Sequence, residues 1–153
     1  MRKITKLLYR ILFSEQEDNI KKQKNFPKNS ILLAEDNPII VRSIKSLLAQ
    51  RGYHVTAVED GSKTLNYLKS YTYDWVLLDL VLPEIEGIDV VKDYRCWEKQ
   101  TNRPYLPVFG LTAYPFKEMK HVCKEAGMAY LFEKPFKLDD LKLIEDFLKN
   151  RGN

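Results

Sequence analysis

The feature that most constrains the fold is an alternation of short apolar runs with longer segments of helical periodicity. The runs lie at residues 31–34, 53–58, 75–79, 107–111 and 130–133. Each has the length of a buried strand, and the segment after it repeats its apolar residues at helical spacing. Strands that alternate with helices favour a parallel sheet covered on both faces, because the crossovers are right-handed. We therefore expect an α/β fold, a doubly wound five-stranded parallel sheet with five helices.

Charged and polar side chains stand where four of these runs end. Glu35 and Asp36 follow the first run, and Asp79 ends the third. Thr112 follows the fourth run, and Lys134 follows the fifth. Ligands of open α/β sheets bind beside the carboxyl ends of the strands. We therefore expect three carboxylates, one hydroxyl and one ammonium group to meet at one edge of the sheet.

This set of groups suits phosphoryl transfer. Three neighbouring carboxylates repel one another, and Mg²⁺ is a hard cation that prefers oxygen ligands. A carboxylate can attack a phosphoryl group and form an acyl phosphate. In that reaction the metal and Lys134 would offset charge on the transferring oxygens, and Thr112 would donate a hydrogen bond.

Four motifs make the chain resemble a receiver domain of two-component signalling. Each motif is weak alone, but all four occur in order and each lies at the end of an expected strand. The resemblance implies a flavodoxin-like strand order of 2-1-3-4-5, counted along the chain. The motifs are ILLAEDNP at 31–38, VLLDLVLPEIEG at 76–87, GLTA at 110–113 and EKPF at 133–136.

The resemblance also implies the phosphoacceptor and the metal ligands. Asp79 would accept the phosphoryl group from a phosphohistidine of a histidine kinase or a histidine phosphotransfer protein. Glu35, Asp36, Asp79 and the backbone carbonyl of Val81 would hold Mg²⁺, with Asp36 as a direct ligand and Glu35 acting through water.

By the same resemblance, Thr112 and Lys134 would contact the phosphoryl oxygens, and the peptide bond before Pro135 would be cis. Receivers that switch commonly carry Tyr or Phe three residues before the lysine. This chain has Leu131 there, and its aromatic neighbours would point to the opposite face of the strand. The usual coupling between the threonine and a rotating aromatic ring is therefore not expected.

Two alternatives stay open at this point. A phosphohydrolase of the haloacid dehalogenase type also uses an aspartate after a strand and Mg²⁺, but it carries a second aspartate where this chain has Val81. A degenerate receiver would use the fold as a phosphorylation-independent binding scaffold. The full set of acids and lysine argues against this alternative, and Leu131 keeps it open. We favour a receiver that assists its own phosphorylation and dephosphorylation and is not a turnover enzyme on a separate substrate.

The net charge of +4 is unevenly distributed. Residues 1–30 hold eight Lys and Arg residues and three acids, so the remaining residues carry a net charge of −1. Direct nucleic-acid binding is therefore not expected of the folded domain. Apolar residues repeat at helical spacing within residues 1–13, and a lysine-rich polar stretch follows. We expect a basic amphipathic helix and linker at residues 1–29, ahead of a receiver domain at residues 30–150.

The role of the N-terminal helix stays open. Weak contact with an anionic membrane surface, self-pairing and docking on a partner all fit a basic amphipathic pattern. No signal peptide or transmembrane run is visible, so a cytoplasmic protein is expected. No DNA-binding module follows the last expected helix, which favours output through protein contacts. A homodimer of the kind that many relatives form is also an open expectation.

Overall fold

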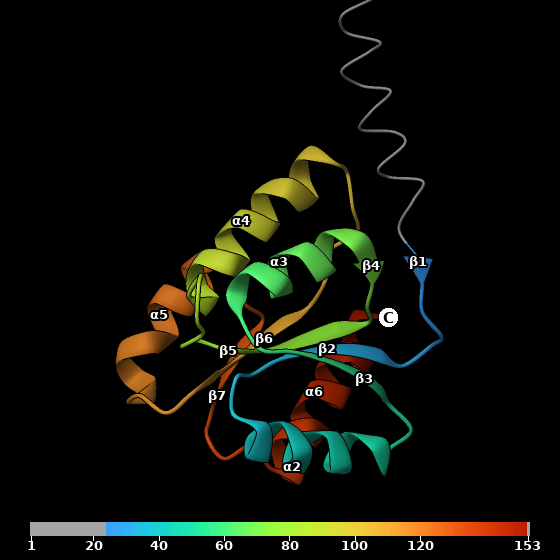
Figure 1. The fold of residues 1–153 in the computed structure, drawn as a ribbon, viewed down its shortest axis with the longest axis vertical. Coiled ribbons are helices and arrows are strands. Elements are labelled where there is room, and N and C mark those ends of the chain that lie inside the picture. The colour runs from blue at the N-terminus through green and yellow to red at the C-terminus, as the bar shows by residue number, and fades with distance from the viewer. Residues whose placement is uncertain (1–23, 153) are drawn as a thin grey trace, which may run out of the picture.

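The computed structural model describes residues 24–152, so the helix expected within residues 1–13 lies outside the described part. Five parallel strands form one sheet in the order β3-β2-β5-β6-β7 (Figure 1). Counted along the chain, this is the predicted order 2-1-3-4-5, and the predicted fold class is confirmed. The strands are β2 (Ser30–Ala34), β3 (His54–Val58), β5 (Trp75–Asp79), β6 (Val108–Thr112) and β7 (Tyr130–Glu133).

In the described part of the chain, four helices connect the strands, a fifth follows the last strand, and together they cover both faces of the sheet. In Figure 1, α3, α4 and α5 lie on one face, and α2 and α6 lie on the other. Within residues 24–152, none of the helices is both long enough and apolar enough to cross a membrane. The helices are α2 (Pro38–Ala49), α3 (Gly61–Ser70), α4 (Gly87–Gln100), α5 (Phe116–Ala126) and α6 (Leu138–Arg151).

The core consists of two apolar layers, one on each face of the sheet. Because side chains alternate along a strand, Leu32 packs in the layer beneath α3, α4 and α5, whereas Leu33 packs in the layer beneath α2 and α6. All residues of β2, β5 and β6 are buried. Full burial of one leucine contributes about 1.5–3 kcal/mol, so these central strands hold the sheet and the residues at its ends in place.

Helix α2 begins just after the acidic pair. Asn37 is its N-cap, and its side-chain oxygen accepts hydrogen bonds from the backbone N–H groups of Ile39 and Ile40 at 2.9 and 3.4 Å. Pro38 occupies the first helical position, where its missing N–H costs nothing. Asp36 and Asn37 both have side chains that commonly cap helices. Since Asn37 takes that role, the Asp36 carboxylate is left for the site.

Part of the predicted linker is bound to the domain. Lys24–Asn25 form a short strand, β1, which pairs in parallel with β4 (Tyr71–Thr72). Phe26 packs on Tyr71 and Tyr73, with ring centroids 5.0 and 5.5 Å apart. The chain is therefore held against the domain from residue 24, five residues before the predicted boundary at residue 29.

Candidate functional site

Three carboxylates meet at the carboxyl edge of the sheet. Glu35 and Asp36 follow β2, and Asp79 ends the adjacent strand β5. One oxygen from each carboxylate lies within 4.8 Å of the other two. Glu35 and Asp79 are 2% and 5% exposed, and Asp36 is exposed. The fold thus brings the predicted acidic cluster together and leaves one side of it open to solvent.

Both oxygens of the Asp79 carboxylate have a partner. Oδ1 accepts a hydrogen bond from the backbone N–H of Val81 at 3.0 Å. Oδ2 accepts a hydrogen bond from the ammonium group of Lys134 at 2.7 Å. The first contact is a local turn and the second crosses from the end of β7, so together they hold the carboxylate in one orientation.

Lys134 bridges two of the acids. Its Nζ lies 2.9 Å from Oε2 of Glu35, in addition to its bond with Asp79. Burial works to lower the pKa of Lys134, but the hydrogen bonds with Asp79 and Glu35 outweigh burial and raise that pKa. The side chain therefore stays charged at neutral pH. The peptide bond between Lys134 and Pro135 is cis, as predicted.

The charged form of Glu35 is disfavoured by burial. Burial raises its pKa, although hydrogen bonds from Lys134 and from the backbone N–H of Asn37 act in the opposite direction. Three carboxylates face one lysine, so the cluster has an excess of negative charge in a partly buried place. A divalent cation with oxygen ligands would remove that excess, and the donor set therefore fits Mg²⁺.

Thr112 ends β6 beside the acidic cluster. Its side chain is buried, and Oγ1 accepts a hydrogen bond from the backbone N–H of Tyr114 at 3.0 Å. A hydroxyl group that accepts one hydrogen bond still has its own hydrogen to donate. The backbone carbonyl of Thr112 also accepts from the N–H of Lys134 at 2.8 Å, which ties these two residues together.

Two glycines hold the loop between β5 and α4. The N–H of Gly61 donates to the carbonyl oxygen of Pro83 at 2.9 Å, and a Cβ at Gly61 would overlap the backbone of Ile85. A Cβ at Gly87 would overlap the carbonyl oxygen of Asp79. Larger residues would push this loop away from Asp79. The contact of Gly61 with this loop could not be predicted from the sequence, because a close approach of two backbone segments leaves no periodic pattern. Gly87 is part of the motif at 76–87, but its contact with Asp79 is not evident from that motif.

The strand before Lys134 presents a leucine to the core. Leu131 is 3% exposed and packs in the layer beneath α5, whereas Phe132 packs in the opposite layer. Tyr130 is 46% exposed, and its ring lies tilted against the ring of Phe132 with a centroid distance of 4.9 Å. The expected opposite orientation of the aromatic neighbours is confirmed, and no aromatic ring occupies the Leu131 position.

Comparison with known proteins places this geometry in a family. The profile of the response regulator receiver domain matches residues 31–144. The peroxide stress-activated histidine kinase mak3 of Schizosaccharomyces pombe is 32% identical over 138 residues, which cover 88% of this chain. The match spans 6% of that kinase, so the chain corresponds to a small part of this relative.

Two solved structures are similar over most of the chain. The receiver domain of the sensor histidine kinase PA1611 from Pseudomonas aeruginosa, with a magnesium ion in its active site cleft, is 31% identical. The TM-score is 0.70, and the match covers 80% of this chain and 99% of that one. The second is the co-crystal structure of the histidine phosphotransfer protein Ypd1 and the receiver domain of Ssk1 from Saccharomyces cerevisiae. The matching chain of that structure is 27% identical to this chain, with a TM-score of 0.71. That match covers 78% of this chain and 87% of the other.

Proposed function

Because the chain belongs to the response regulator receiver domain family, we propose that it accepts a phosphoryl group on Asp79 in a two-component phosphorelay. The observation that carries the proposal is the contact of the Asp79 carboxylate with Lys134, beside Glu35 and Asp36. An aspartate that only ended a strand would have no need of a half-buried lysine and two further acids.

The reaction moves a phosphoryl group from nitrogen to oxygen. An oxygen of Asp79 forms a bond to phosphorus while the N–P bond of the donor phosphohistidine breaks. The electron pair of that bond stays on the imidazole, and a ring protonated on its other nitrogen leaves as neutral histidine. The product on this chain is an acyl phosphate, as expected for a carboxylate nucleophile.

The residues around Asp79 have separate roles in this transfer. The N–H of Val81 and the ammonium group of Lys134 orient the carboxylate for attack. As the phosphoryl group arrives, Lys134 moves from its bond with Asp79 to the phosphoryl oxygens, and the Thr112 hydroxyl donates to another of them.

The cation site consists of groups from two adjacent strand ends. Asp36, Asp79 and the carbonyl of Val81 would hold Mg²⁺ directly, with Glu35 acting through water. When bound, Mg²⁺ neutralises charge on the phosphoryl oxygens. The buried Glu35 carboxylate also keeps Lys134 beside Asp79 before the donor arrives, because its Oε2 lies 2.9 Å from the ammonium group.

The surface around the site suits a protein donor. Ile39, Val81 and Tyr114 are 79%, 49% and 56% exposed, and they lie close in sequence to the acidic pair, Asp79 and Thr112 respectively. Exposed apolar side chains beside a reactive centre favour docking of a protein. We therefore propose a histidine kinase or a histidine phosphotransfer protein as partner. A cytoplasmic location, a homodimer and membrane contact by residues 1–13 stay predictions.

The first test is phosphorylation by a small donor. The wild type is incubated with acetyl phosphate and Mg²⁺, and its intact mass is compared with that of Asp79→Asn. One phosphate adduct on the wild type, none on Asp79→Asn and none without Mg²⁺ would support the proposal. A protein that never forms the adduct but still binds its partner would be a scaffold, and steady turnover of a small phosphate ester would instead indicate a phosphohydrolase.

A further inference from the structure

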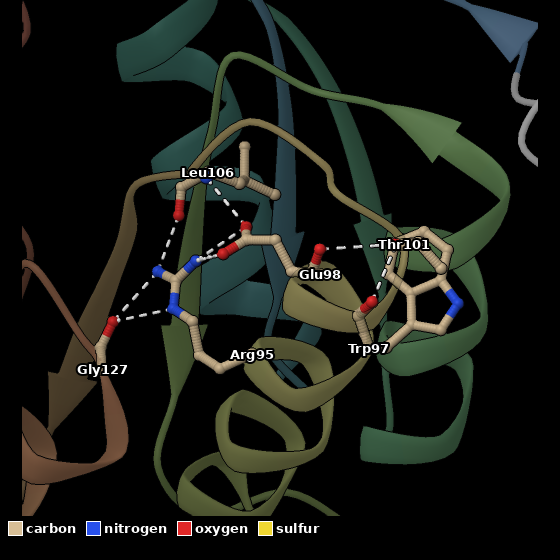
Figure 2. Close-up of polar contacts among 6 residues, drawn as sticks. All are labelled: Arg95, Trp97, Glu98, Thr101, Leu106 and Gly127. Atoms are coloured by element: carbon tan, nitrogen blue, oxygen red, sulfur yellow. Dashed lines mark hydrogen bonds and ion pairs between the residues drawn. The ribbon is translucent and has the colours of Figure 1, made fainter.

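Arg95, near the end of α4, joins three segments of the chain (Figure 2). Its Nε and Nη2 donate to the carbonyl oxygen of Gly127 at 3.0 and 2.9 Å. Nη2 also donates to the carbonyl oxygen of Leu106 at 2.7 Å, and Nη1 donates to both carboxylate oxygens of Glu98 at 2.9 Å. Helix α4, the loop before β6 and the end of α5 therefore share one guanidinium group.

The partners of Arg95 are themselves fixed. Glu98 is 7% exposed, and its Oε2 also accepts from the N–H of Leu106 at 2.9 Å. The Arg95 guanidinium carbon lies 4.2 Å from the ring centroid of Tyr105, and that of Arg151 lies 4.6 Å from the same centroid. Charge-assisted hydrogen bonds are strong, and a partly buried network of them resists displacement.

Gly127 closes the C-terminal end of α5. Its φ of +102° is the left-handed conformation that favours glycine, and its N–H donates to the carbonyl oxygen of Lys124 at 3.1 Å. A Cβ on Gly127 would lie 3.0 Å from both Cγ and Nε of Arg95. The close approach that brings two Arg95 nitrogens to this carbonyl therefore depends on glycine.

The N-terminal end of α5 lacks such a connection. Pro115 is its N-cap and makes no side-chain capping hydrogen bond. Tyr114 is 56% exposed, and its backbone N–H reaches the site through one hydrogen bond to Oγ1 of Thr112. The end of α5 nearest the phosphoryl site is thus held by apolar packing of Phe116 and few hydrogen bonds, whereas the far end is held by the Arg95 network.

We propose that Arg95 is a positioning residue that makes the C-terminal end of α5 a fixed pivot. Phosphorylation changes the contacts of Thr112, and the hydrogen bond from Tyr114 passes this change to the first turn of α5. The last turn stays in place because Gly127 remains bound to Arg95. The helix therefore responds by rotating about its last turn instead of shifting as a whole. This inference rests on the proposed phosphorylation of Asp79.

Amide hydrogen exchange of the full chain tests the pivot, with and without acetyl phosphate in the presence of Mg²⁺. In the wild type we expect phosphorylation to change exchange at residues 116–119 by about tenfold or more, and at residues 123–127 by less than about twofold. In Arg95→Lys, which keeps a charge near Glu98 but lacks the two-nitrogen contact with Gly127, phosphorylation should change exchange at both ends.

Arg51→Met is the matched control, because it removes another arginine that pairs with a glutamate, Glu145, on the opposite face of the sheet. It should show the wild-type pattern. A merely structural role for Arg95 would raise exchange at residues 123–127 equally in both states, and that result would overturn the pivot. So would equal responses at both ends of α5 in the wild type. Intact mass of the same samples separates these outcomes from failure of the proposed function, since absence of an adduct would overturn both proposals.

Discussion

The two edges of the sheet differ in how their acidic side chains are paired with basic ones. At the carboxyl edge, Glu35, Asp36 and Asp79 share one lysine, and two of these acids are buried. At the amino edge, each buried or half-buried acid has its own arginine. The pairs there are Arg95 with Glu98, at 2.9 Å, and Arg51 with Glu145, at 2.7 Å.

This difference separates the proposed phosphorylation site from the ion pairs that stabilise the fold. The excess of carboxylates at the carboxyl edge makes the fold without metal less stable than a neutral edge would, and under the proposed function the same carboxylates would hold a cation. Neutralisation of a buried acid at this edge should impair phosphorylation and leave stability equal or higher. Substitutions at the amino edge should lower stability and leave phosphorylation intact. Four variants test this contrast.

The largest effect is expected from Arg95→Met at the amino edge. The substitution leaves the Glu98 carboxylate, 7% exposed, without its cationic partner. Removal of one member of a buried ion pair typically costs about 3–5 kcal/mol. Urea unfolding should show this loss in the free energy of unfolding, while the folded fraction still forms the phosphate adduct. A loss below about 1 kcal/mol would mean that the pair is not a stabilising element.

At the carboxyl edge, Lys134→Met should act on the reaction. It removes the ammonium group that contacts Asp79 at 2.7 Å. Removal of one preorganised charge donor typically lowers a rate about 10²–10³-fold. The initial rate of adduct formation, measured by intact mass at saturating Mg²⁺, checks this, and Lys142→Met, on the exposed surface of α6, is the control. Wild-type rates in Lys134→Met would remove the lysine from the proposed mechanism.

Glu35→Gln should raise the stability of the metal-free domain and weaken Mg²⁺ binding. Burial raises the pKa of Glu35 in the folded state, so the wild type loses stability as pH rises above 4.5 and the carboxylate becomes charged. The variant lacks this loss, so at pH 7 its free energy of unfolding should exceed that of the wild type by on the order of 1 kcal/mol. Urea unfolding with a chelator at pH 4 and pH 7 measures the difference in the free energy of unfolding between the variant and the wild type, and how that difference changes with pH. A less stable variant at pH 7 would show that the Lys134 contact outweighs burial.

The smallest effect is expected from Glu145→Gln, the same change at the amino edge. The hydrogen bond from Arg51 lowers the pKa of Glu145 in the folded state. The stabilisation from this pair is therefore fully present above pH 4.5 and is lost as pH falls through the lowered pKa. The pair is partly exposed, so the variant should lose about 0.5 kcal/mol at pH 7. Its pH dependence should have the opposite sign to that of Glu35→Gln. The same sign for both glutamates would contradict the contrast between the edges.

The fold and the placement of the acids and Lys134 at one edge could be predicted because buried parallel strands leave a direct trace in sequence. Residues 75–79 form a continuous apolar run that ends in an acid, and both its burial and the place of Asp79 follow from that pattern. The bond between Lys134 and Asp79 spans 55 positions, and only the parallel topology made it predictable.

What could not be predicted depends on contacts without a local pattern. Arg95 and Glu98 stand three residues apart on a helix, as exposed ion pairs commonly do. Their burial comes from the loop that ends at Leu106 and from Gly127 at the end of α5, both outside that helix. The pairing of Lys24–Asn25 with β4 involves two residues, too few to show strand periodicity. Alternation predicted that Leu131 and Tyr130 would face opposite sides, but the 46% exposure of Tyr130 depends on what packs around it.

The most direct test of the central claim locates the acyl phosphate on the chain. The wild type is treated with acetyl phosphate and Mg²⁺ and then reduced with borohydride, which converts an aspartyl phosphate to homoserine, and the peptides are sequenced by mass spectrometry. We expect homoserine at position 79 and nowhere else. Reduction at Asp36 instead, or stable phosphate on a hydroxyl side chain with Asp79 unchanged, would contradict the assignment of Asp79 as the phosphoacceptor.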